Sequence, residues 1–336
     1  MHRFSIIDNH SISKIKQIAQ AIQRDIEKGI LVKNQSLPSI NAFSKEYKVA
    51  RDTIEKAYNL LKEEGLVGSR KGKGYFVIGK ADTQIKVLLI FNKLSSYKKM
   101  VYDAIVETLG KKAKVDLQIH YYNPNTLKEI IDNNLGKYHY YVVMPHFYLN
   151  ANKQDCKEIL LRIPEKELII LDKAFAGLGR NTTSIHQDFE HDIYSALNAS
   201  GKLIKKYSAI DLLLDETDHH PQELKTGIRK YCLENDKTFN ISSRSSLNCL
   251  QKKTVYIVTS EDDLALVVKQ ARLTKMELGK DIGIISFNES VLKELLDITV
   301  VTTNFKEMGV SAANCILKGE TRKMVNPFSL IQRGSL

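Results

Sequence analysis

The chain of 336 residues has little cysteine and lacks any long apolar run. Its four cysteines are scattered, so they fit neither a disulfide framework nor the ligand spacing of a zinc site. They are Cys156, Cys232, Cys249 and Cys315. We therefore expect reduced, mostly buried thiols and no metal. No stretch approaches the ~18 apolar residues that span a bilayer, and residues 1–10 are polar, unlike a secretory signal. The sequence predicts a cytoplasmic protein without a membrane segment.

The motifs of several enzyme classes are also absent. There is no Walker-type phosphate loop, no G-x-S-x-G elbow, no H-E-x-x-H motif and no Rossmann glycine fingerprint after the apolar run at 85–91. The nearest approach to a metal cluster is His219 and His220 beside Asp215, Glu216 and Asp218. Adjacent histidines point in different directions on most backbones, which favours an exposed loop. We expect no catalytic residue and no cofactor, and a small-molecule-processing enzyme is the less favoured alternative.

The formal net charge of +11 is unevenly distributed along the chain. Residues 1–80 contain fifteen Lys and Arg against eight Asp and Glu, which leaves seven of the eleven excess charges in this first quarter. A basic surface gains affinity for phosphates by displacing their counterions. The asymmetry therefore indicates a polyanionic partner for the N-terminal part, although a basic, solvated surface would have the same composition.

Residues 13–77 have the pattern of a helix-turn-helix followed by a wing. Apolar spacing over 13–29 predicts a helix that ends at Gly29, and Ser39 can cap a second, short helix. A tight turn at Lys48 and Val49 leads to a third helix over about 50–64. Two short strands then flank a basic, glycine-rich turn at residues 69–74. Such a turn can lie close to a phosphate or enter a groove.

Residues 13–78 resemble the winged-helix domain of the GntR family of bacterial regulators. The resemblance rests on Leu37-Pro38-Ser39, residues 49–54, residues 60–66 and residues 72–77. It implies that the third helix reads the major groove of double-stranded DNA, where Arg51 suits the O6 and N7 atoms of guanine. The expected DNA-binding residues are Ser39, Asn41, Ala50, Arg51, Thr53, Lys56, Arg70, Lys71, Gly72, Lys73 and Gly74.

The chain departs from the GntR pattern at several of these positions. Ile40 and Asn41 replace the usual acidic-basic pair, and Ala50 replaces Ser or Thr. The acids Asp52 and Glu55 on the third helix repel phosphate. The operator sequence therefore does not follow from the resemblance.

Beyond residue 84 the pattern changes to alternating strands and helices. We expect a DNA-binding domain over 1–79, a linker over 80–84 and a larger domain over 85–336. Strands are predicted at 85–91, 115–120, 140–144, 168–171, 210–214, 255–259 and 282–287. Helices are predicted around 101–109 and near 125–135, 188–205, 222–235 and 261–277. This alternation predicts an α/β fold with parallel sheets in two lobes.

Residues 85–335 resemble the effector domain of LacI-type regulators, which has the periplasmic-binding-protein fold. The matching segments are residues 168–173, 184–188, 255–266, 281–290, 299–304 and 330–335. In this fold small molecules bind in the cleft between the lobes, at the carboxyl ends of strands. The expected effector-binding residues are Asn92, Ser96, Tyr97, Asp172, Lys173, Asp188, Lys225, Asp262 and Asn288.

Polar side chains at these positions suit a hydroxylated effector, either a sugar or a sugar phosphate held by Lys173 or Lys225. Two departures weigh against a standard sugar site. Leu224 stands where sugar-binding members often have Arg, and Asn288 stands where relatives have Asp. For Asp172, Asp188 and Asp262, a structural role as a cap or hinge residue is an equal alternative.

The sequence thus predicts a homodimeric DNA-binding transcription regulator. Two-fold symmetry would present two winged helices to a near-palindromic operator. An effector would close the lobes and change the spacing of the recognition helices, and release from DNA, the commoner pattern in LacI-like proteins, would make it a repressor. The alternative is an architectural DNA binder whose C-terminal region only dimerises.

Overall fold

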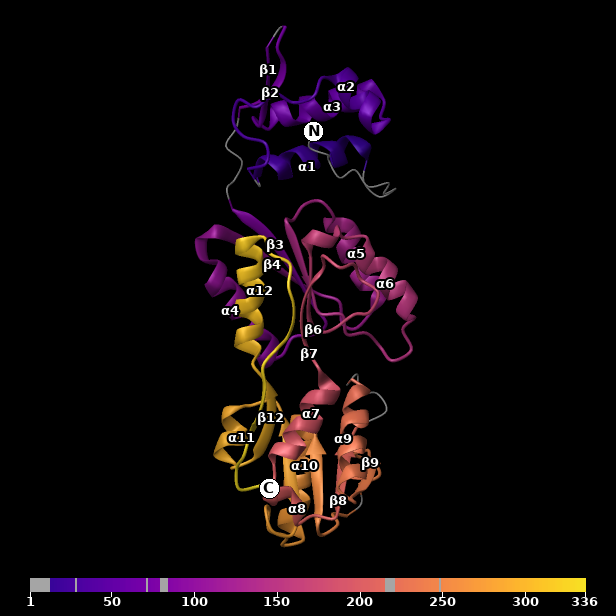
Figure 1. Ribbon diagram of the computed structural model, residues 1–336, viewed down its shortest axis with the longest axis vertical. Coiled ribbons are helices and arrows are strands. Elements are labelled where there is room, and N and C mark those ends of the chain that lie inside the picture. Colours follow the sequence, from indigo (N-terminus) through magenta and orange to yellow (C-terminus); the bar gives the residue numbers. More distant parts are fainter. Residues whose placement is uncertain (1–12, 28, 71, 79–83, 215–220, 248) are drawn as a thin grey trace.

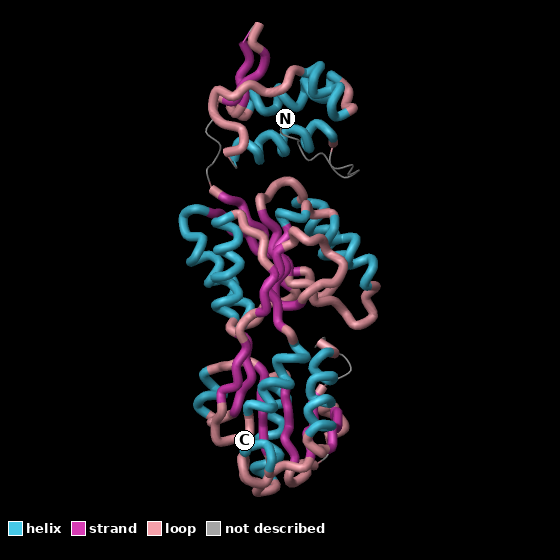
Figure 2. Tube along the Cα trace, viewed as in Figure 1, coloured by secondary structure: helices cyan, strands magenta, loops and turns pink. Residues whose placement is uncertain are grey.

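The computed structural model describes residues 13–27, 29–70, 72–78, 84–214, 221–247 and 249–336. Three bodies follow one another along its long axis: the N-terminal module, lobe 1 and lobe 2 (Figure 1). Lobe 1 is built from residues 85–187 and 305–325, and lobe 2 from residues 189–303 and 328–336. Strands run through the middle of both lobes, with helices outside them (Figure 2). The predicted fold class, a winged helix joined to a two-lobed parallel α/β domain, is confirmed.

The N-terminal module has the predicted order of elements. They are α1 (Lys14–Glu27), α2 (Ile40–Tyr47), α3 (Arg51–Glu63), β1 (Val67–Arg70) and β2 (Gly74–Val77). The Ser39 hydroxyl caps α2 by accepting a hydrogen bond from the Ala42 amide at 3.1 Å. Lys48, in the left-handed conformation at φ 53°, ends α2 and forms the turn to α3. The buried Tyr58 ring joins the core, and its hydroxyl donates to the Pro38 carbonyl at 2.8 Å.

Lobe 1 contains a parallel sheet of order β13-β7-β6-β5-β3-β4. Its strands are β3 (Ile85–Phe91), β4 (Ala113–Ile119), β5 (Tyr140–Val143), β6 (Leu168–Lys173), β7 (Thr183–Gln187) and β13 (Lys323–Val325). Its helices are α4 (Ser96–Leu109), α5 (Pro124–Asn134), α6 (Lys153–Leu161) and α12 (Phe305–Lys318), with short 3-10 turns η1 (Gly110–Lys112) and η2 (Glu165–Glu167). Helices α4 and α12 cover one face of the sheet, and α5 and α6 cover the other (Figure 1).

Lobe 2 contains a second sheet of order β14-β12-β11-β10-β8-β9, parallel except at the β12–β14 edge. Its strands are β8 (Ala209–Leu213), β9 (Thr238–Ser242), β10 (Thr254–Val258), β11 (Gly283–Phe287), β12 (Thr299–Thr303) and β14 (Phe328–Ile331). Its helices are α7 (Phe189–Ala199), α8 (Lys202–Lys205), α9 (Glu223–Glu234), α10 (Glu261–Leu273) and α11 (Val291–Leu295).

Several elements differ from the sequence prediction. The helix expected over 188–205 is divided into α7 and α8, because Gly201 turns the chain at φ 53°. The helix expected over 261–277 ends at Leu273. Helices α6, α11 and α12 and strands β7, β9, β12, β13 and β14 were not predicted. Of the expected linker only Gln84 is described.

The prediction of mostly buried thiols is confirmed. Cys156, Cys232 and Cys315 are buried, Cys249 is exposed, and all four are free thiols. In the described part of the chain, every helix is too short or too polar to cross a membrane.

The chain passes between the lobes three times: after β7, after β12, and between β13 and β14. Asp188 and Asn304 follow the first two of these strands and cap α7 and α12. The buried Asn326 lies in the third crossing, and its Nδ2 donates to Thr303 Oγ1 at 2.7 Å and to the Asn304 carbonyl at 2.9 Å. The backbone amide of Asn326 donates to the His186 carbonyl at 2.7 Å. Hydrogen bonds therefore join all three crossings into one hinge.

Asp192, in the first turn of α7, is an unfavourably buried carboxyl group in this region. The residue is 8% exposed, and its Oδ2 has no hydrogen-bond partner among the described atoms. Burial, and then the neighbouring charge of Asp188, raise the pKa of Asp192 to about 6. The folded state therefore disfavours the charged carboxylate.

Removing this charge should stabilise the protein in a pH-dependent way. The penalty is absent below the ordinary Asp pKa of about 3.9, grows as pH rises from there to the raised value of about 6, and is constant above it. We expect Asp192→Asn to raise the Tm at pH 7.5 by about 2–4 °C, the shift that corresponds to roughly 1 kcal/mol, and to leave it unchanged at pH 4. Calorimetry at both pH values checks this. The exposed Asp262→Asn is the control, and an equal gain at pH 4 would contradict the explanation.

Candidate DNA-binding surface and ligand cleft

The predicted DNA-binding residues of the helix-turn-helix lie at the amino ends of α2 and α3. Arg51 is the first residue of α3 and is exposed, as are Ala50 before it and Lys56 one turn later. Thr53 is half-buried, and Asn41 is exposed on the first turn of α2. Amino ends of helices carry unpaired amides and a partial positive charge, which favours phosphate. This surface faces away from lobe 1 (Figure 1).

The wing is the antiparallel pair β1 and β2, which projects beyond α3 (Figure 1). Gly72 and Gly74 have φ values of 82° and 77°, a conformation that side chains disfavour, so the tight turn depends on glycine. The Arg70 guanidinium lies 4.9 Å from the centre of the Phe76 ring, which supports it at the base of the turn. Lys73 is exposed, and Lys71 lies outside the described residues.

The acids noted in the sequence share this surface. Asp52 and Glu55 are exposed on α3 beside Arg51. They would repel a phosphate and could accept a hydrogen bond from the cytosine N4 amino group. The exposed surface of α3 therefore carries charges of both signs and is not a uniformly basic patch.

In lobe 1, Asp172 forms a buried ionic cluster at the carboxyl end of β6. Lys98 Nζ pairs with Asp172 Oδ2, His146 Nε2 lies 2.8 Å from the same oxygen, and Gln187 Nε2 donates to Oδ1 at 2.5 Å. Burial alone would raise the pKa of Asp172, but the charge of Lys98 and the His146 contact outweigh it and hold the pKa well below its usual range. Burial lowers the pKa of His146 despite the neighbouring Asp172, and because the carboxylate can only accept, Nε2 of His146 is the donor. Every carboxylate oxygen of Asp172 is thus already engaged.

Polar contacts bridge the lobes across the cleft at two places. The Tyr97 hydroxyl, at the start of α4, donates to Glu261 Oε1 of lobe 2 at 3.3 Å. The buried Lys293 ammonium lies 3.1 Å from the same carboxylate and 3.4 Å from the Tyr97 hydroxyl. On another side of the cleft, Lys173 Nζ of lobe 1 lies 3.9 Å from Glu223 Oε1 of lobe 2. Opening or closing the cleft must therefore change these polar contacts.

A cavity of about 530 Å³ lies in the cleft beside the second bridge. It is framed by the loops after β5 and β6, the start of α6 and the start of α9. Its aromatic lining comes from Phe147, Tyr148 and Phe175, and its charged lining from Lys153, Lys157, Lys173 and Glu223. A volume in this range holds a small metabolite.

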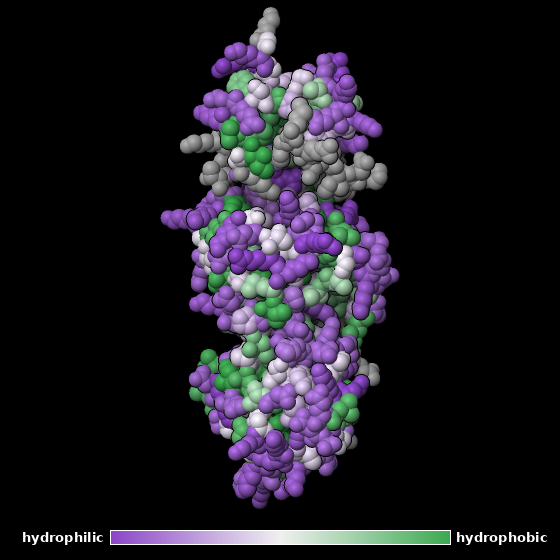
Figure 3. Space-filling view, in the orientation of Figure 1, coloured by the Kyte–Doolittle hydropathy of each residue, from purple (hydrophilic) through white to green (hydrophobic). Residues whose placement is uncertain are grey.

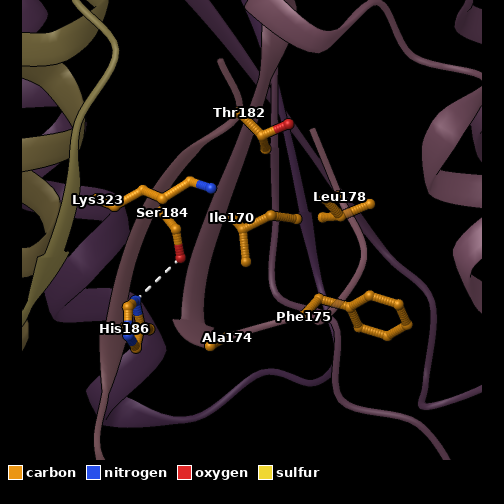
Figure 4. A pocket seen from close by; sticks show the side chains of 8 residues that line it. All are labelled: Ile170, Ala174, Phe175, Leu178, Thr182, Ser184, His186 and Lys323. Atoms are coloured by element: carbon orange, nitrogen blue, oxygen red, sulfur yellow. Dashed lines mark hydrogen bonds between the residues drawn. The ribbon is translucent and has the colours of Figure 1, made fainter. Parts of the chain in front are cut away.

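A smaller cavity of about 180 Å³ borders the larger one (Figure 4). The two share Ala174 and Phe175. Ser184 Oγ lies 3.0 Å from His186 Nδ1 on β7, and the Lys323 side chain extends over the same space (Figure 4). Together the cavities follow β6 and β7 toward the hinge.

The other predicted effector-binding residues are dispersed. Asn92 is buried after β3, and within the described chain its Oδ1 has no hydrogen-bond partner. Ser96 is exposed, Lys225 is half-buried on α9, and Asn288 turns the chain after β11 at φ 66°. Asp188 caps α7, as the alternative interpretation held.

Asp262 is 82% exposed on α10, where its carboxylate lies 3.5 Å from Arg244. Its neighbour Asp263 is the buried residue, and it pairs with Arg244 and accepts from the Ser260 hydroxyl at 2.6 Å.

Sequence reasoning missed several residues that the fold brings to the cleft. Lys98 and Lys293 lie on helices and are buried because each forms an ion pair with a carboxylate. No local sequence pattern distinguishes them from solvated lysines. His146 and Phe147 follow β5, so their position after a predicted strand was the available signal. The histidine pair at 219 and 220 and its acids lie outside the described residues.

Comparisons with known proteins agree with this architecture. Residues 14–77 match the family described as bacterial regulatory proteins, gntR family. The chain is 27% identical over 213 residues to the HTH-type transcriptional regulator TreR of Bacillus subtilis, a stretch that covers 63% of this chain and 80% of TreR.

Two solved structures share the fold of the C-terminal region. One is the trehalose repressor from Escherichia coli, with a TM-score of 0.60 and 14% identity over 74% of this chain and 100% of that one. The other is a periplasmic binding protein/LacI transcriptional regulator from Alkaliphilus metalliredigens in complex with D-xylulofuranose, with a TM-score of 0.55 and 13% identity over 74% and 98% of the two chains. The chain is therefore a transcription regulator in which a GntR-family helix-turn-helix domain is joined to a C-terminal domain with the fold of the LacI-type regulators.

Proposed function

We propose that this regulator is a repressor whose affinity for operator DNA is controlled by a small molecule bound between the lobes. In this proposal residues 1–79 bind DNA, residues 80–84 link, and residues 85–336 bind the effector and dimerise. It acts in the cytoplasm, where the operator lies, and it catalyses no reaction. The observation that carries the proposal is the cavity of about 530 Å³ at the junction of two lobes that are bridged by polar contacts.

The lining of this cavity favours a sugar phosphate over a neutral sugar. Lys153, Lys157 and Lys173 contribute three positive charges, against the one negative charge of Glu223. Aromatic rings line the same cavity and suit the apolar face of a sugar ring. The named functions of the trehalose repressor and of the xylulofuranose complex support a carbohydrate ligand. Asp172 is occupied by Lys98 and His146, so we do not assign it to the ligand. We assign the recognition of the phosphate to the lysines.

An effector in this position would act by moving the lobes. Lys173 lies on lobe 1 and Glu223 on lobe 2, so a phosphate that takes Lys173 from Glu223 alters the bridge between the lobes. The single hinge restricts the response to rotation of one lobe against the other. Such coupling is typically worth about 1–3 kcal/mol, enough to change DNA occupancy 5- to 150-fold.

The proposal requires a homodimer, and one side of the molecule suits it. Helix α11 and the residue after it expose four apolar side chains: Val291, Leu292, Leu295 and Leu296. On lobe 1, Leu94 and Met100 are exposed at α4, which lies on the same side of the molecule (Figure 1). Figure 3 shows the apolar side chains gathered over α11. A second copy would cover this apolar surface in a symmetric contact.

Arg51 should be essential for reading the operator. A bidentate Arg–guanine contact contributes about 1–3 kcal/mol to base discrimination, and a dimer would use it twice. We expect Arg51→Ala to abolish specific binding to duplexes selected by the wild type, while ligand-induced thermal shifts stay unchanged. Fluorescence anisotropy and thermal shift measure the two properties. Lys280→Ala, which removes an exposed charge from lobe 2, is the matched control. Equal loss of both properties would refute the two-module assignment.

The ligand class is tested by a thermal-shift panel of sugars and their phosphates. A ligand at 100 times its Kd stabilises the folded state by about 2.7 kcal/mol, so a binder gives a clear rise in Tm. We expect a rise with a sugar phosphate and no rise with the parent sugar. Lys173→Gln should bind the sugar phosphate with a ten- to hundredfold lower affinity, since a charged hydrogen bond contributes about 1.5–3 kcal/mol. Lys280→Gln is the control.

The other outcomes of this panel are equally informative. An equal response to the unphosphorylated sugar would contradict the role of the lysines. A blank across the panel would favour a C-terminal domain that only dimerises.

The dimer surface is tested by sedimentation. Leu295 is 76% exposed, so Leu295→Asp places a charge in the proposed contact without disturbing the core. We expect the wild type to sediment as a dimer and the variant as a monomer with unchanged Tm. Leu233→Asp is the matched control, because Leu233 is 75% exposed on α9 at the opposite side of lobe 2 (Figure 1). Loss of the dimer in the control, or a dimeric Leu295→Asp, would exclude this surface.

A further inference from the structure

The polar face of α1 is buried against lobe 1. The Glu27 side chain is 4% exposed, and its carboxylate lies 3.0 Å from both Lys86 Nζ and His139 Nε2. Gln23, one turn earlier on α1, donates to Glu27 Oε1 at 2.9 Å. Burial raises the pKa of Glu27, but these hydrogen bonds, that from His139 first, outweigh it and leave the pKa below its usual value. The carboxylate is therefore charged and fully used inside the contact.

The hydrogen bonds of His139 fix its tautomer. The Lys86 amide donates to His139 Nδ1 at 2.8 Å, so this nitrogen carries no proton. The neutral ring must then carry its proton on Nε2, which points at Glu27. The His139 amide in turn donates to the Lys86 carbonyl at 2.8 Å. The backbone of β3 therefore orients the ring from within lobe 1, independently of the N-terminal module.

A second ion pair and a close backbone approach extend the contact. Arg24 Nη1 lies 3.0 Å and 3.1 Å from the two carboxylate oxygens of Glu167, and both side chains are about nine-tenths buried. At Gly136, with φ 82°, a Cβ would stand 3.0 Å from the Gln20 side-chain oxygen, so α1 packs closely on this turn. Two buried ion pairs are a strong geometric constraint, because breaking either leaves a charge without its partner.

The position of this contact connects the two ends of lobe 1. Lys86, His139 and Glu167 lie at the amino ends of β3, β5 and β6. The carboxyl ends of the same three strands lead into the cleft, where His146 and Asp172 lie. On the N-terminal module, Gln20, Arg24 and Glu27 share the α1 face opposite its buried apolar face, and α3 and the wing face outward (Figure 1). The contact thus leaves the DNA-binding surface free.

We infer that Arg24, Glu27, Lys86, His139 and Glu167 are positioning residues for DNA recognition, which hold the winged helix in one orientation on lobe 1. With the module held, the two recognition helices of a dimer keep one separation, and only an operator with the matching half-site spacing engages both. Without the contact, the module is attached only through the segment between Ile78 and Gln84. This inference rests on the proposed dimeric DNA binding.

The test compares half-site spacings. A set of duplexes carries the selected half-site once, or twice with the separation varied by about five base pairs, half a helical turn. Joining two contacts gains about 10²–10⁴-fold in affinity and loses that gain when geometry prevents both from forming. We expect the wild type to lose about a hundredfold or more when the spacing is shifted.

Charge reversal isolates the contact. Arg24→Glu and Glu167→Arg should each bind both spacings within about tenfold, with affinity for the single half-site unchanged, and the double variant should recover spacing selectivity. A merely structural role would not change selectivity at constant half-site affinity. Lys280→Glu, an exposed charge reversal in lobe 2, is the matched control and should behave as the wild type.

Each outcome bears on the inference. A wild type without spacing selectivity, or single variants as selective as the wild type, would overturn it. If a charge-reversal variant fails to fold, Glu27→Gln, which keeps the side-chain volume but loses the charge that pairs with Lys86, decides the question by the same readout. A wild type that binds no duplex at all refutes the proposed function itself, which is a distinguishable result.

Discussion

The hinge formed by the three chain crossings is the constraint on which the ligand cleft depends. Asn326 bonds to the strand ends of the other two crossings, so the three segments that connect the lobes are held together at one place. The lobes therefore cannot slide independently. Parallel strands bring their carboxyl ends to one edge of each sheet, and the hinge sets these edges against each other. The cavity, the Lys173–Glu223 bridge and the Tyr97–Glu261 contact all lie within the space that this arrangement defines.

The charges of the cleft are divided between structure and recognition. Asp172 holds Lys98 and His146 in place, and Lys293 holds Glu261 while its ammonium also donates to two carbonyls of the loop after β11. These groups are satisfied without a ligand, so they define the shape of the cleft. Of the lysines around the large cavity, Lys173 has a long contact of 3.9 Å to Glu223, and in the proposed function it is the group that responds to an anion.

Lobe 1 carries a polar contact at each end of the same strands. The amino ends of β3 and β6 meet α1 through the ion pairs Lys86–Glu27 and Arg24–Glu167, and the amino end of β5 meets it through the His139–Glu27 hydrogen bond. The carboxyl ends of these strands form one wall of the cleft. The sheet between these ends is densely packed, so the contact with α1 and the wall of the cleft belong to one packed core.

Local patterns alone determined the helix-turn-helix, the wing and seven strands of the two lobes. Ser39 caps a helix wherever the chain places it, and the apolar run at 85–91 makes a buried strand in any parallel sheet. These predictions needed only neighbouring residues. The same reasoning missed α12, whose apolar face is buried only because the chain returns to lobe 1 after β12. It also chose Asp262 as an effector-binding residue, although the neighbouring Asp263 is the buried one. Lys98 and Asp172 are far apart in sequence, and so are Glu27 and Lys86. Their burial and charge were decided by the tertiary structure, because a charge can be buried only where a distant partner neutralises it.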